Sequence, residues 1–103
     1  MRKLILLILA TFTILNADAN LPASTIKNIA TGWGGEGLFL SINNSTVVEE
    51  CVNPRIYISP TNTMYNEILS IALSSFHAST NVVFRISGCR GENMNGIAIS
   101  ISK

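Results

Sequence analysis

The chain has few of the residues from which catalytic and metal centres are built. It contains one histidine, His77, two cysteines and a single aspartate, Asp18. A zinc site would need further ligands, so we expect no metal and no cofactor. No glycine-rich phosphate loop precedes a helix, and nothing places a carboxylate for a serine–histidine mechanism. The sequence therefore predicts a protein that is not an enzyme.

An excess of charge of one sign is also lacking. Charged residues make up 13% of the chain, and the formal net charge is +1. Beyond residue 19 the charges balance, with cations at Lys27, Arg55, Arg85, Arg90 and Lys103 and carboxylates at Glu36, Glu49, Glu50, Glu67 and Glu92. A protein that neutralises a phosphate backbone usually carries a basic stripe, so we expect no nucleic-acid partner.

The only long apolar run lies at the start of the chain. The pair Arg2-Lys3 precedes the run from Leu4 to Leu15, and Ala17-Asp18-Ala19 is a small-x-small peptidase site. A membrane anchor would need about 20 apolar residues, and this run is shorter. We therefore predict a signal peptide over residues 1–19 and a single secreted or periplasmic domain over 20–103, with no membrane anchor after cleavage.

The two cysteines fit this compartment. Cys51 and Cys89 can form one intramolecular disulfide, which small exported domains commonly need because their cores are small. A pair of reactive thiols is the alternative, but a reactive thiol needs an activating neighbour. The predicted disulfide would stabilise the fold by about 3 to 4 kcal/mol.

Hydrophobic periodicity predicts three strands, one helix and two further strands. The strands are expected over residues 25–31, 37–43, 55–59, 82–87 and 96–102, and the helix over 63–79. Residues 20–24 are expected to be a loosely held lead, and residues 90–95 a polar loop. The predicted buried helix face comprises Tyr65, Ile68, Leu69, Ala72, Leu73 and Phe76, whereas Ser75 is assigned to the polar face.

This order of elements, β-β-β-α-β-β, defines a mainly β domain with one helix. It is the order of the OB-fold, a five-stranded Greek-key barrel, and we expect that barrel here. An α+β sandwich with the helix on one sheet face has the same composition of elements and stays open as the alternative.

The chain also resembles small exported bacterial proteins similar to the B subunit of subtilase cytotoxin. The resemblance rests on the segments around Gly-Leu-Phe-Leu-Ser-Ile, Arg-Ile-Tyr-Ile-Ser, Tyr-Asn-Glu-Ile-Leu-Ser-Ile-Ala-Leu and Val-Val-Phe-Arg-Ile, and it spans about residues 26 to 101. It implies an OB-fold binding subunit that forms pentamers, binds cell-surface glycans and carries a separate catalytic chain. The family's glycan-contacting residues do not map onto this chain.

Four side chains are candidates for ligand binding. Trp33 lies among glycines beside Glu36, where an indole could stack on a sugar and a carboxylate could accept from its hydroxyls; the alternative places Trp33 in the core. Tyr57 and Arg85 alternate with core isoleucines and are expected on the outer surface, as a ligand face, a subunit interface or simply a solvated strand face.

Two other features are better explained by structure than by catalysis. His77 lies near the predicted end of the helix, where a histidine interacts favourably with the terminal carbonyls. Glu49 and Glu50 are adjacent, so on a strand they would point to opposite faces and could not act as a pair. We predict a secreted, non-catalytic glycan-binding module; the alternative is an exported protein-interaction or inhibitor domain.

Overall fold

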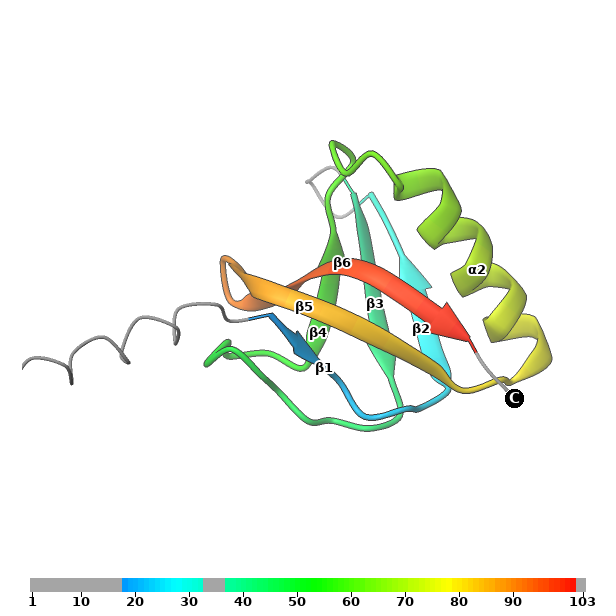
Figure 1. The fold of residues 1–103 in the computed structure, drawn as a ribbon, viewed down its shortest axis with the longest axis horizontal. Coiled ribbons are helices and arrows are strands. Elements are labelled where there is room, and N and C mark those ends of the chain that lie inside the picture. Colours follow the sequence, from blue (N-terminus) through cyan, green and yellow to red (C-terminus); the bar gives the residue numbers. More distant parts are fainter. Residues whose placement is uncertain (1–17, 33–36, 102–103) are drawn as a thin grey trace, which may run out of the picture.

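The computed structural model describes residues 18–32 and 37–101. These residues form six strands and one helix, namely β1 (Ala19–Asn20), β2 (Ile26–Ala30), β3 (Leu38–Ile42), β4 (Arg55–Ile58), α2 (Tyr65–Ala78), β5 (Val82–Arg90) and β6 (Asn93–Ile101). The strands make one mixed sheet in the order β1-β5-β6-β4-β3-β2 (Figure 1). The predicted class, mainly β with one helix, is confirmed. The sheet has six strands instead of the five expected, and its described strands do not close into a barrel. Within the described ranges no helix is long and apolar enough to cross a membrane.

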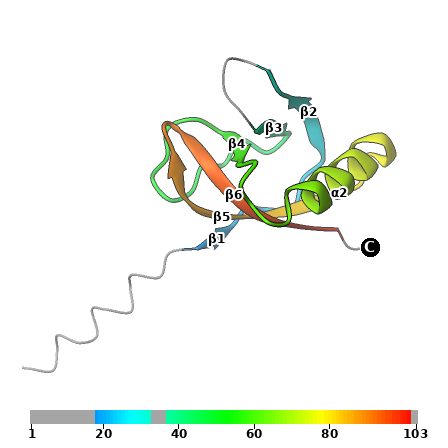
Figure 2. The same cartoon turned by 90° about the horizontal axis from the view of Figure 1, so that it is seen from above.

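The core forms because the strands alternate as the sequence predicted. Leu40, Ile56 and Phe84 are completely buried, and their neighbours on the same faces of β3, β4 and β5 are at most 5% exposed. Each such side chain stabilises the fold by about 1.5 to 3 kcal/mol relative to exposure. Helix α2 contacts both β2 and β6, although β3 and β4 lie between them in the sheet. The sheet is therefore strongly curved around its core (Figure 2).

The expectation of a loose lead over residues 20–24 is wrong. Leu21 is buried, and its backbone N–H donates to the Phe84 carbonyl oxygen at 2.9 Å. Ser24 exchanges backbone hydrogen bonds with Val82 at 3.0 and 2.8 Å. The sheet gains its sixth strand here, because β1 pairs with β5. A single buried leucine has no periodicity, so pattern analysis could not detect this docking.

The irregular alternation of β2 results from a β-bulge. Ile26 pairs with Ile42, but the next paired residue is Asn28, opposite Ser41, so that Lys27 is the extra residue. Ile26 and Ile29 both contact the core although they are three positions apart. Because a bulge re-aims the side chains around it, Lys27 and Asn28 are both exposed.

Helix α2 buries a different face from the one predicted. Ile68 and Ala72 are buried as expected, but the third fully buried position is Ser75, whose hydroxyl donates to the Ile71 carbonyl at 2.8 Å. Leu73 and Phe76 are 42% and 41% exposed. Because its hydroxyl is hydrogen-bonded within the helix, the small Ser75 can lie against the sheet without leaving a buried polar group unpaired. The larger Leu73 and Phe76 side chains point outward instead.

The connections of β4 and β5 also differ from prediction. The expected loop over residues 90–95 is mostly strand, because β5 continues to Arg90 and β6 begins at Asn93. Residues Glu49 and Glu50 form a turn with φ of 60° at each, not a strand. The disulfide between Cys51 and Cys89 is confirmed, with Cα atoms 5.6 Å apart, and it joins this turn to the end of β5.

Candidate functional site

The outer face of β2, β3 and β4 carries two cross-strand rows. Asn28 pairs with Ser41, and Ser41 pairs with Arg55, so these three polar side chains follow one line across the sheet. The next row consists of Ala30, Phe39 and Tyr57. Neighbouring strands lie about 4.8 Å apart, so each row spans about 10 Å. A polar row beside an aromatic row is thus built from residues scattered over 30 positions of sequence.

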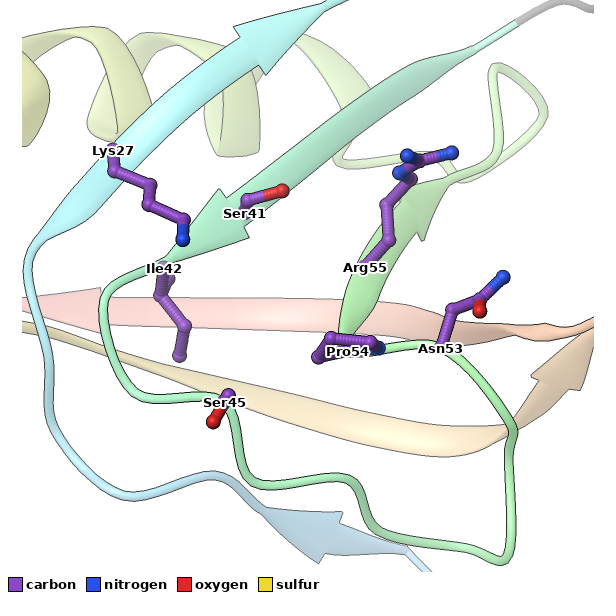
Figure 3. A pocket seen from close by; sticks show the side chains of 7 residues that line it. All are labelled: Lys27, Ser41, Ile42, Ser45, Asn53, Pro54 and Arg55. Carbon is purple, nitrogen blue, oxygen red and sulfur yellow. The ribbon is translucent and has the colours of Figure 1, made fainter.

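Two adjoining hollows follow these rows, and we call their combined surface the outer-face groove. The larger, of about 580 Å³, is lined by Asn28, Ala30, Phe39, Ser41 and Arg55. The smaller, of about 180 Å³, is lined by Lys27, Ser41, Ile42, Ser45, Asn53, Pro54 and Arg55. Figure 3 shows Lys27, Ser41 and Arg55 rising from three neighbouring strands, with helix α2 behind them. The groove is a shallow surface depression on the side of the sheet away from the helix.

The aromatic row is held rigidly. The Phe39 and Tyr57 rings are 5.3 Å apart at 53°, a tilted geometry that aromatic pairs favour. The Arg90 guanidinium lies over the Tyr57 ring, 4.7 Å from its centroid. Tyr57 is only 4% exposed, whereas Phe39 is half-buried. Phe39 is therefore the ring of this row that is open to a ligand, and Tyr57 supports it.

The chemistry of the outer-face groove is hydrogen bonding and charge attraction. Arg55 presents a planar fork of donors and Lys27 a compact ammonium, while Asn28, Ser41 and Asn53 both donate and accept. Asn53 is oriented by a hydrogen bond from its Nδ2 to Asn93 Oδ1 at 3.3 Å. In the part of the chain that the structure describes, no carboxylate makes an ion pair with Lys27 or Arg55, and no cluster of residues could hold a metal ion.

The structure places the four predicted site residues as follows. Trp33 and Glu36 lie outside the described residues. Tyr57 is on the outer face as expected, but it is buried there, with the Phe39 ring and the Arg90 guanidinium lying against its ring. Arg85 is exposed on β5, where its Nε lies 3.5 Å from Asp18 Oδ2. Arg85 is not among the residues lining the outer-face groove.

Sequence reasoning missed most of the groove. Polar residues in a strand that alternates polar and apolar positions look like ordinary solvent-exposed positions. For this reason five of the groove residues were not singled out from the sequence, namely Lys27, Asn28, Ser41, Asn53 and Arg55. One signal was present in the sequence. The three-residue spacing of Ile26 and Ile29 breaks the alternation of a strand, and such a break is typical of a bulge that turns an extra polar side chain outward.

Comparison with known proteins gave no family-model match and no match among curated proteins.

Proposed function

We propose that the protein is an exported, non-catalytic binding module and that the outer-face groove binds a glycan. The observation that carries this proposal is the pairing of Asn28, Ser41 and Arg55 in one row beside the half-buried Phe39. Glycan sites are shallow surfaces where hydroxyl and amide groups meet sugar hydroxyls and an aromatic ring meets a sugar ring. The resemblance to toxin B subunits supports the same class of ligand.

The two cations add a preference within that class. Arg55 can bind a carboxylate with two parallel hydrogen bonds, and Lys27 supplies a second positive charge to the same hollow. A glycan that carries an acidic sugar therefore fits the groove better than a neutral one. The hollow is open, so we expect weak binding at each site and a benefit from several copies acting together.

We further propose that β2 to β6 and α2 have the strand arrangement of an OB-fold. The strand order β2-β3-β4-β6-β5, with the helix between β4 and β5, supports it. So does the course of residues 19–30, which pair with β5 through β1 and Ser24 and with β3 through β2. One continuous segment therefore forms one end of the five-strand array, as β2, and pairs with the strand at the other end, β5.

Replacing Arg55 with alanine is expected to weaken acidic-glycan binding about 10-fold to 100-fold, because a charge-assisted hydrogen bond contributes about 1.5 to 3 kcal/mol. A glycan array of the oxidised protein would identify the ligand, and calorimetric titration of that ligand would measure the loss. Lys27→Ala should give a smaller loss, and Glu67→Gln, on the exposed face of α2, serves as the control. An Arg55→Ala protein that binds as well as the parent would contradict the proposed site.

A second candidate function is protein interaction, and the exposed apolar stripe of α2 favours it. Leu73 and Phe76 continue the line of the half-buried Tyr65 and Leu69 along the helix. A helix stripe of this kind commonly contacts another protein surface. The resemblance to toxin B subunits, which form pentamers, favours a further copy of the chain as this partner.

The double variant Leu73→Gln/Phe76→Gln is therefore expected to lower the mass of the protein in solution to that of a single chain. The reason is that two polar amides cannot be buried in an apolar contact without lost hydrogen bonds. Sedimentation equilibrium would measure the mass, and Ser74→Gln, at a neighbouring exposed helix position, is the matched control. A parent protein that is already monomeric would exclude self-association through α2.

A further inference from the structure

The exposed cation Arg85 forms an ion pair with a carboxylate that the predicted cleavage of the signal peptide would remove. Its Nε lies 3.5 Å from Asp18 Oδ2, and the two side chains are 49% and 39% exposed. Asp18 precedes the predicted cleavage point, the peptide bond between Ala19 and Asn20. Cleavage would therefore remove the only carboxylate that the described residues place in ion-pair contact with Arg85.

The same peptide bond lies inside β1. Ala19 pairs with Ile86, and Asn20 pairs with Arg85, at the edge of the sheet. After cleavage Leu21 would still be held by its buried side chain and its hydrogen bond to Phe84. The new chain end at Asn20 would thus stay opposite Arg85, where paired Cα atoms are about 4.5 to 5.5 Å apart.

Maturation would change the local charge from neutral to strongly positive. Before cleavage the Arg85 guanidinium faces the Asp18 carboxylate. After cleavage the nearest charged group on β1 would be the α-ammonium of Asn20, which is mostly protonated at neutral pH. Asn20 and Arg85 both line a hollow of about 180 Å³, together with Val83, Ala98, Ile99 and Ser100. The Ser100 hydroxyl and the Asn20 amide are further donors at this hollow.

We propose that removal of residues 1–19 creates an oxyanion site between Arg85 and the new N-terminus at Asn20. The site would take a carboxylate, sulfate or phosphate group, because two cations close together with hydroxyl and amide donors match the charge and geometry of such a group. It is separate from the outer-face groove and does not depend on glycan binding there. In the uncleaved chain the Asp18 carboxylate is the anion beside Arg85.

The test first determines the N-terminus of the exported protein by intact mass. It then follows the backbone amide resonances during titration with sodium sulfate, at constant ionic strength maintained with sodium chloride. The chain beginning at Asn20 should show saturable shifts at Val83, Arg85 and Ser100. A chain beginning at Asp18 should bind sulfate at least tenfold more weakly.

Two variants separate the site from general charge attraction. Arg85→Gln should abolish the saturable shifts in the chain that begins at Asn20, and Arg85→Lys should retain part of them. In the chain that begins at Asp18, Asp18→Asn should recover part of the affinity. An exported protein that retains Asp18, equal affinity in the two chains, or shifts spread evenly over the surface would overturn the proposal. A glycan that shifts the amide resonances of residues around Arg55 would not alter these outcomes. The proposal for the oxyanion site and the proposal for the outer-face groove can therefore fail independently.

Discussion

Replacing Cys51 and Cys89 with alanine is expected to lower the free energy of unfolding by about 3 to 4 kcal/mol. The disulfide closes a loop with a sequence separation of 38, which contains β4, α2 and most of β5. Without it, the unfolded chain regains the conformational freedom of that loop. The loss is a large part of the stability of a domain this small. Denaturation in guanidinium chloride, followed by circular dichroism, would measure it.

The disulfide also holds a strained turn in place. Glu49 and Glu50 both have φ of 60°, a conformation that costs a non-glycine residue about 1 to 3 kcal/mol. Glu49 Oε1 accepts a hydrogen bond from the Gly88 N–H at 3.1 Å, which fastens the same turn to β5. The reduced parent protein should match the double variant. A decrease in the free energy of unfolding of less than about 1 kcal/mol would contradict this prediction. It would mean that the backbone hydrogen bonds from Val52 and Asn53 to Glu92 hold the turn against β5 without the disulfide.

Replacing Gly37 with alanine is expected to cost about 3 to 4 kcal/mol of stability, from backbone strain and overpacking together. Gly37 has φ of +104°, and an added Cβ would lie 2.5 Å from the Ile58 carbonyl oxygen and 2.9 Å from Tyr57 Cε1. The carbonyl belongs to the backbone of β4 and cannot turn aside. The start of β3 would therefore be pushed away from β4. Thermal and chemical denaturation of the variant would measure the cost.

Gly32 provides a matched control for this prediction. It also has a positive φ, +86°, but an added Cβ would meet nothing within 4 Å. Gly32→Ala should therefore cost only the backbone strain, about 1 kcal/mol. Because Gly37 packs on Tyr57 beneath the aromatic row, its substitution should also weaken glycan binding under conditions where the variant is folded. If the two substitutions lowered the free energy of unfolding equally, β3 and β4 would be able to move apart at this point without further loss of stability.

Several elements of this fold could be predicted because their signals are local. The clean alternation of residues 38–42 and 82–86 predicted β3 and the first part of β5, and the helical spacing around Ile68 and Ala72 predicted α2. The disulfide followed from the count of two cysteines in a chain with a predicted export signal. Errors arose where burial depends on partners distant in sequence. Leu21 is buried beside Phe84, and Ser75 replaced Leu73 against the sheet because its hydroxyl is satisfied within the helix.

The candidate site was less predictable than the fold. Tyr57 was found from its alternation with Ile56 and Ile58, but its burial depends on Phe39 and Arg90, which come from other strands. A sequence shows which face of its own strand a residue occupies. It does not show which residue of the next strand lies opposite, because register is fixed by pairing across the sheet.

The sequence alone determined the class of the domain, most of its strands and its helix, and the cysteine pair, since each follows from composition or local periodicity. Tertiary structure decided the rest. The bulge at Lys27 and the register of β2, β3 and β4 bring Lys27, Asn28, Ser41 and Arg55 around one groove. The docking of β1 on β5 likewise puts Asp18 beside Arg85. The physical reason is that these contacts join residues far apart in the chain, and only packing and cross-strand hydrogen bonds select them.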